Sequence, residues 1–210
     1  ATTGTITNAV TFSNTGSVTL GASTGSLAFT GGITATAPSA INVAGTITAA
    51  TTAALNLGAP VNVTANTTIG GTSTGNITLG AATLVDGATL TVGTGIANAI
   101  SLSSVSGTAS GTTSNLTINT TGAVTVSGAV GTDIGTITIT NSGGTTFSST
   151  VDAATLAITS TSANNAVAFN GNLTLGTGMT VGAGSAAYNV AIKGSSNTIA
   201  GATTFNNTGT

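Results

Sequence analysis

The sequence contains no cysteine, histidine or tryptophan, and only 2% of its 210 residues are charged. Without cysteine and histidine, the chain cannot form disulfides and lacks the side chains that zinc prefers. The charged residues are Asp86, Asp133, Asp152 and Lys193. Acid–base and nucleophilic catalysis need a carboxylate, an imidazole or another base close to the reacting group, and these four residues are spread widely along the chain. The sequence therefore predicts a protein that is not an enzyme and that binds no cofactor or metal.

Positive charge is almost absent. Lys193 is the only basic residue, whereas nucleic acids and anionic membrane surfaces are bound through several lysines or arginines. The chain has no uninterrupted apolar run of about 18 residues, so no transmembrane helix is predicted. Hydrophobic residues nevertheless make up 40% of the chain, which is enough for a core and argues against disorder. All three aspartates are interpreted as turn residues, and Lys193 as a surface charge.

What the chain has in abundance is short runs in which apolar and polar residues alternate. Clear examples are 115–118 (Asn-Leu-Thr-Ile), 136–140 (Thr-Ile-Thr-Ile-Thr) and 172–175 (Asn-Leu-Thr-Leu). Alternation with a period of two is typical of β-strands with one buried face. Glycine, asparagine and serine separate the runs and favour turns. Because these residues and threonine are poor helix formers, the sequence predicts an all-β protein.

A longer repeat of roughly 16 to 23 residues lies over the alternation. Eight apolar residues begin similar runs at this spacing and are predicted to form a core ladder: Leu55, Ile77, Ile100, Leu116, Ile137, Leu156, Leu173 and Val190. One coil of a β-solenoid cannot bury its own apolar face, so coils of this length stack on one another. We therefore predict that residues 1–210 form a single repetitive parallel β-helix, with a β-sandwich as the alternative fold.

Two segments add a resemblance to this pattern. Residues 115–131 and 143–151 (Gly-Gly-Thr-Thr-Phe-Ser-Ser-Thr-Val) resemble the repeats of large secreted bacterial β-strand proteins. These are similar to filamentous-haemagglutinin-type adhesins and to autotransporter passengers. The resemblance implies a right-handed parallel β-helix outside the cell, in an adhesin, fibre, sheath or surface layer. It carries over no catalytic residue.

Seven asparagines stand in Asn-x-Ser/Thr sequons, the acceptor sites of N-glycosylation. They are Asn62, Asn66, Asn76, Asn115, Asn119, Asn172 and Asn206. Such sequons arise often by chance in a chain rich in threonine and asparagine. Asparagine side chains also stack into hydrogen-bonded ladders between equivalent strands, and we expect this structural use at most of the seven.

Thr-x-Thr triplets suggest an alternative function. They occur at 5–7, 46–48, 89–91 and 136–140, and outward threonine pairs resemble the ice-binding face of β-solenoid antifreeze proteins. Such a face needs threonine at the same place in nearly every coil, whereas the triplets are scattered along the sequence. A carbohydrate-binding adhesin is a further alternative, although Tyr188 is the only tyrosine that could supply an aromatic platform.

The function expected from the sequence is structural. Solenoid ends are normally covered by capping elements, and no charged cap is visible near Ala1 or Thr210. Unprotected strand edges pair with other chains. We therefore expect a secreted, extracellular or cell-surface protein that belongs to a longer chain or assembles end to end. Its expected partners are copies of itself and, in an adhesin, surface glycans.

Overall fold

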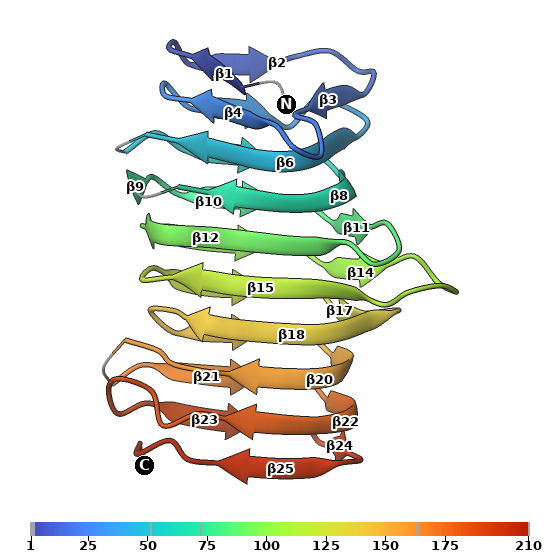
Figure 1. Cartoon of the computed structure of the whole chain (residues 1–210), viewed down its shortest axis with the longest axis vertical. Helices are drawn as coiled ribbons and strands as arrows, with labels where there is room; N and C mark the ends of the chain where they lie inside the picture. The colour runs from blue at the N-terminus through green and yellow to red at the C-terminus, as the bar shows by residue number, and fades with distance from the viewer. Residues whose placement is uncertain (1–2, 51, 72, 163, 210) are drawn as a thin grey trace.

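The computed structural model describes residues 3–50, 52–71, 73–162 and 164–209, and within them it has strands but no helix. All paired strands are parallel, and each coil lies directly on the one before it (Figure 1). The N-terminal and C-terminal coils therefore form the two ends of the long axis. This arrangement confirms the predicted all-β parallel β-solenoid.

Each coil contributes strands to three faces. The first face has nine strands: β2 (Val10–Phe12), β5 (Ile33–Ala35), β7 (Leu55–Leu57), β10 (Ile77–Leu79), β13 (Ala99–Leu102), β16 (Ala123–Val126), β19 (Thr145–Phe147), β21 (Ala166–Phe169) and β23 (Asn189–Ile192). Four long strands run through the second face and on into the third: β6 (Ile41–Ala49), β8 (Val61–Gly70), β20 (Val151–Ile158) and β22 (Leu173–Val181).

Shorter strands complete the other two faces. The second face also contains β3 (Val18–Leu20), β11 (Ala82–Leu84), β14 (Val105–Gly107), β17 (Val130–Gly131) and β24 (Thr198–Ile199). The third face also contains β1 (Thr3–Ile6), β4 (Ser26–Phe29), β12 (Thr89–Ala97), β15 (Ser114–Thr120), β18 (Ile134–Asn141) and β25 (Ala202–Phe205). A two-residue strand, β9 (Ser73–Thr74), pairs with the end of β12. Apart from β9, the described part of the third face has ten strands, whereas each of the other two faces has nine.

Coil length varies because the connections between faces differ in length. On the third face, the separation along the chain is shortest between the register partners Ile137 and Leu156. It is longest between Leu90 and Leu116, where an exposed loop joins β14 to β15 and projects from the stack in Figure 1. The shortest spacing in the predicted repeat separates Ile100 from Leu116. These two residues lie on the first and the third face, so they are not equivalent residues of neighbouring coils.

The eight residues predicted to form one core ladder belong to three. Leu55, Ile77, Ile100 and Val190 lie on the first face, Leu116, Ile137 and Leu156 on the third, and Leu173 on the second. All are buried except Val190, which is half-buried in the last coil. The prediction of a single ladder is therefore wrong, although all eight point into the core. Similar runs recur on every face, so the repeat alone does not tell the faces apart.

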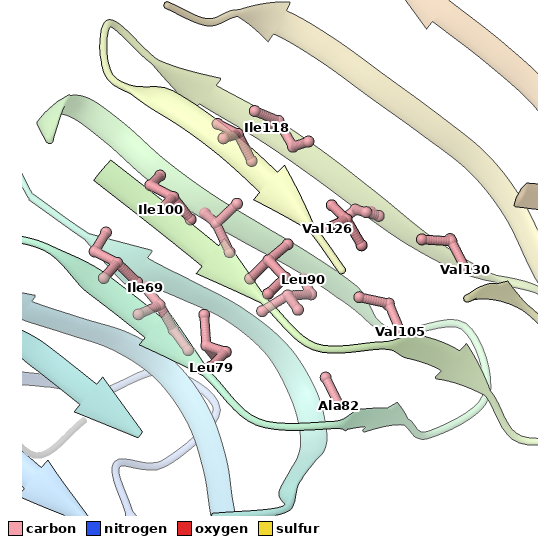
Figure 2. Close-up of a cluster of buried hydrophobic side chains, with 14 of the residues drawn as sticks. Ile69, Leu79, Ala82, Leu90, Ile100, Val105, Ile118, Val126 and Val130 are labelled. Carbon is pink, nitrogen blue, oxygen red and sulfur yellow. The ribbon is translucent and has the colours of Figure 1, made fainter. Parts of the chain in front are cut away.

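The core is a narrow column filled by alternate residues of each strand. Figure 2 shows aliphatic side chains such as Leu79, Leu90 and Ile118 at successive levels between the strands, and all three are buried. In the C-terminal half of the core, the rings of Phe147 and Phe169 stack with centroids 4.9 Å apart. Because these two residues are register partners on β19 and β21, the strand ladder itself sets the stacking.

Candidate functional site

The four charged residues lie in different elements of the fold. Asp86 lies in an exposed turn and Asp133 in a bend, as predicted, and Lys193 is exposed just after β23. Asp152 was expected in a turn but lies on β20, with its side chain exposed on the second face. In the described ranges, no three potential metal-ligating residues gather in one place.

Asparagine side chains connect one coil to the next, but among the sequons only Asn62 does so through the predicted bond to another asparagine side chain. The Asn62 side-chain amide donates to Asn42 Oδ1 at 3.0 Å, which forms a short amide ladder on the second face. Asn66 Oδ1 accepts from the Thr89 N–H at 2.9 Å, and Asn115 Oδ1 accepts from the Thr136 N–H at 2.9 Å. The side chains of the last two thus satisfy backbone N–H groups of the following coil where the chain turns onto the third face.

The other four sequon asparagines differ in burial and in hydrogen bonding. Asn172 Oδ1 accepts from the Ser196 N–H at 3.0 Å. Asn119 lies half-buried on β15, and Asn76 and Asn206 are exposed. Glycosylation at any of the seven remains a prediction.

The third face carries an outward column that the sequence did not reveal. Residues in register on its ten strands form what we call the threonine column: Thr3, Ser26, Thr46, Thr68, Thr91, Thr117, Thr138, Ala157, Thr180 and Thr204. Eight of the ten are threonine. The triplets at 46–48, 89–91 and 136–140 each contribute one threonine to this column, and they looked scattered because coil length varies. The triplet at 5–7 lies outside the column, because Thr5 pairs with Ala28.

The end coils leave strand edges open. Among the described residues, β2 pairs only with β5 and β3 only with β6, while at the other end β23 pairs only with β21. The inward side chains of these coils are incompletely covered: Ile6, Val10, Phe12, Val190, Ile192 and Ile199 are partly buried. Phe205 on β25 is 53% exposed. Each end thus combines unpaired backbone groups with apolar side chains, which is a surface that can pair with further strands.

Tyr188 is not an aromatic platform. It lies on the connection from β22 to β23, and its side chain is fully buried. Its hydroxyl donates to the Gly182 carbonyl oxygen at 2.6 Å. Burial raises the pKa of this phenol because the charged form is poorly solvated. The single tyrosine therefore stabilises the turn before the last coil, and the carbohydrate-binding alternative loses the residue it required.

The buried phenol predicts a loss of stability at high pH. The folded chain holds the phenolic proton more tightly than the unfolded chain, whose pKa is near 10.0. Stability is therefore at its full value below that pH and falls as the pH rises above it. Urea unfolding between pH 8 and pH 11 measures this slope. Tyr188→Phe removes the hydrogen bond and should lower the free energy of unfolding by about 1 kcal/mol at pH 8. Above pH 10 its free energy of unfolding should fall less steeply than that of the unmodified chain. Equal slopes would mean that Tyr188 does not cause the pH dependence.

No helix in the described part of the chain is long and apolar enough to span a membrane. Comparisons of the chain with protein families, curated proteins and solved structures found no match.

Proposed function

We propose that this chain is an extracellular structural protein whose stacked coils form part of a filament, sheath, surface layer or adhesin stalk. The observation that carries this proposal is the stack of parallel coils itself, in which the strand ladders and one apolar core run the length of the described chain. Further coils placed on either end would continue both. The near absence of charge supports the proposal, because no like charges oppose close approach.

Electron microscopy of the purified chain at neutral pH tests this function. A single solenoid of about nine coils would be roughly 45 Å long at the usual spacing of parallel strands. We expect longer rods of the same width, at low and at high salt alike, since screening acts only on charges. Phe205→Asp places a charge at the open edge and should leave short rods. Thr125→Asp adds the same charge to an exposed mid-solenoid position and should not. Short rods from the unmodified chain at every concentration would contradict the proposal.

The threonine column supports a second candidate, binding to ice. Its hydroxyls repeat at the strand spacing of about 4.8 Å on a surface without charge. Polar residues also pair at a neighbouring position in the central coils, Thr89 with Asn115 and Thr136 with Thr155, with a register shift between the two pairs. The regular spacing of the column is what the scattered triplets of the sequence lacked.

Thermal hysteresis and ice-recrystallisation assays test the second candidate. If the column binds ice, Thr117→Lys in its centre should abolish the activity, because a long charged side chain interrupts the regular spacing of the hydroxyls. Thr125→Lys on the first face is the matched control and should retain it. Absence of activity in the unmodified chain would remove this candidate.

A further inference from the structure

The corner between the first and the second face repeats the same backbone arrangement in successive coils. The Asn170 N–H donates to the Phe147 carbonyl oxygen at 2.9 Å. One coil further on, the Lys193 N–H donates to the Phe169 carbonyl oxygen at 2.8 Å. Because β21 and β23 pair in register up to their last residues, Asn170 and Lys193 occupy equivalent places in neighbouring coils.

Both of these residues are unusual in the sequence. Asn170 belongs to the only Asn-Gly dipeptide of the chain, and Lys193 is the only basic residue. Each follows a residue whose side chain points into the core, the buried Phe169 and the partly buried Ile192. Because side chains alternate in direction along a strand, Asn170 and Lys193 point outward, and both are exposed. Their side chains therefore leave the same corner on strands about 4.8 Å apart.

The peptide group between Asn170 and Gly171 is open to reaction. An asparagine followed by glycine cyclises more readily than other asparagines, because glycine has no side chain to hinder its nitrogen. Within the described part of the chain, neither the Asn170 side chain nor the Gly171 N–H makes a hydrogen bond. At the corresponding corner of an earlier coil, by contrast, the Gly128 N–H donates to the Ser103 carbonyl oxygen. The two reacting groups of Asn170 and Gly171 are thus neighbours in the chain and unprotected.

We propose that Asn170 is a site of spontaneous deamidation and that the carboxylate formed there pairs with Lys193 of the following coil. The Gly171 nitrogen attacks the side-chain carbonyl carbon of Asn170 and loses its proton, while the side-chain nitrogen leaves as ammonia. This step closes a five-membered succinimide. Water then adds to one of the two ring carbonyl groups and opens the ring, which gives aspartate or isoaspartate at position 170. The net change replaces an amide by an acid, so the reaction consumes only water and needs no oxidant or reductant.

The positive charge of Lys193 favours both the reaction and its product. The Gly171 nitrogen gains negative charge as it loses its proton, and an ammonium group nearby stabilises that charge. After the ring opens, the new carboxylate and the ammonium group face each other across adjacent strands, where opposite charges attract. Lys193 makes no ion pair with any described residue of the unmodified chain. Deamidation would therefore give the single basic residue its first partner.

Peptide mass spectrometry tests the reaction. The purified chain is incubated at pH 8 and then digested with pepsin at low pH, where deamidation is slow. We expect the mass gain of an amide-to-acid conversion at Asn170, whereas Asn172, whose Oδ1 accepts from the Ser196 N–H, should stay intact. Asn170→Gln is the matched control and should not react, because the longer side chain must close a six-membered ring. Amide loss that is no faster at Asn170 than at Asn172 would overturn the proposal.

Lys193→Gln tests the part played by the charge. The substitution keeps a polar side chain at an exposed position and removes the ammonium group. We expect it to slow amide loss at Asn170 about two- to fivefold at low salt, the range that an exposed charge pair supports. Added salt should shrink the difference between the two chains because it screens charges. Equal rates at low salt would overturn the role assigned to Lys193.

Asn170→Asp supplies the product directly and tests the pairing. At low salt, this variant should unfold at a higher urea concentration than the unmodified chain, because the new carboxylate and Lys193 attract each other across the two coils. The gain should disappear at high salt, and it should also disappear when Asn170→Asp is combined with Lys193→Gln. An Asn170→Asp variant that is no more stable than the unmodified chain at low salt would show that the pair does not form.

Discussion

Ile118→Asp is expected to break the solenoid in its middle. Ile118 is fully buried on β15, between register partners Val92 and Ile139. A carboxyl group there has no hydrogen-bond partner within the aliphatic core, and burying it costs several kcal/mol whether it is charged or protonated. The lost isoleucine packing adds a further cost of about 2–5 kcal/mol. Since coils are stabilised by their immediate neighbours, the defect uncouples the two halves of the stack.

Thr117→Asp is the matched control for this variant. Thr117 is the preceding residue on the same strand, and its side chain points outward in the threonine column. The same charge placed there remains in contact with water and should change the free energy of unfolding by less than about 1 kcal/mol. Circular dichroism during urea unfolding measures both variants. Equal stabilities would mean that the inward and outward positions of β15 have been assigned incorrectly.

Gly45→Ala is expected to destabilise the chain by about 2–5 kcal/mol, the sum of backbone strain and steric overlap. Gly45 lies in β6 where this strand bends from the second face to the third, next to a shift in the β6–β8 register. Its φ is +72°, a conformation that residues with a side chain rarely adopt. A Cβ at this position would overlap the carbonyl oxygens of Ala22 and Gly25 in the preceding coil. Both oxygens already accept hydrogen bonds, Ala22 O from the Gly25 N–H and Gly25 O from the Thr46 N–H, so they cannot move aside without breaking these bonds.

Gly176→Ala tests whether the conformation, rather than the mere loss of glycine, causes the effect. Gly176 lies in β22 at the corresponding bend, but it has no positive φ, and a Cβ would come no closer than 4.0 Å to Ala154 Cα. We expect this variant to be as stable as the unmodified chain or slightly more stable, because alanine restricts the unfolded chain. Thermal unfolding of the two variants compares them directly, and a large loss in Gly176→Ala would count against the explanation.

Local pattern was sufficient to predict the strands but not how they pair. The alternation in 136–140 correctly places Ile137 and Ile139 inside and Thr138 outside, because period two follows from the geometry of a single strand. Assigning Leu116 and Leu173 to their faces required the lengths of the connections between strands, and these vary from coil to coil. The same variation hid the threonine column.

The least predictable residues were those whose role depends on distant neighbours. Asp152 was expected in a turn, yet it lies on a strand because Val151 and Ala153 on either side of it are buried. Burial of Tyr188 depends on how the turn before β23 folds back, and one aromatic residue leaves no periodic signal in a sequence. The open strand edges could be suspected from the missing charged caps, but the extra strand on the third face was visible only in the structure.

The direction of the hydrogen bonds gives this rod a particular mechanical character. Bonds between neighbouring strands run along the long axis, so a force applied to the two ends of the chain pulls these bonds apart one coil after another. A released coil of roughly 20 to 25 residues extends to roughly 70–90 Å. Under tension the solenoid would therefore unfold coil by coil, lengthening by similar increments and dissipating energy at each one.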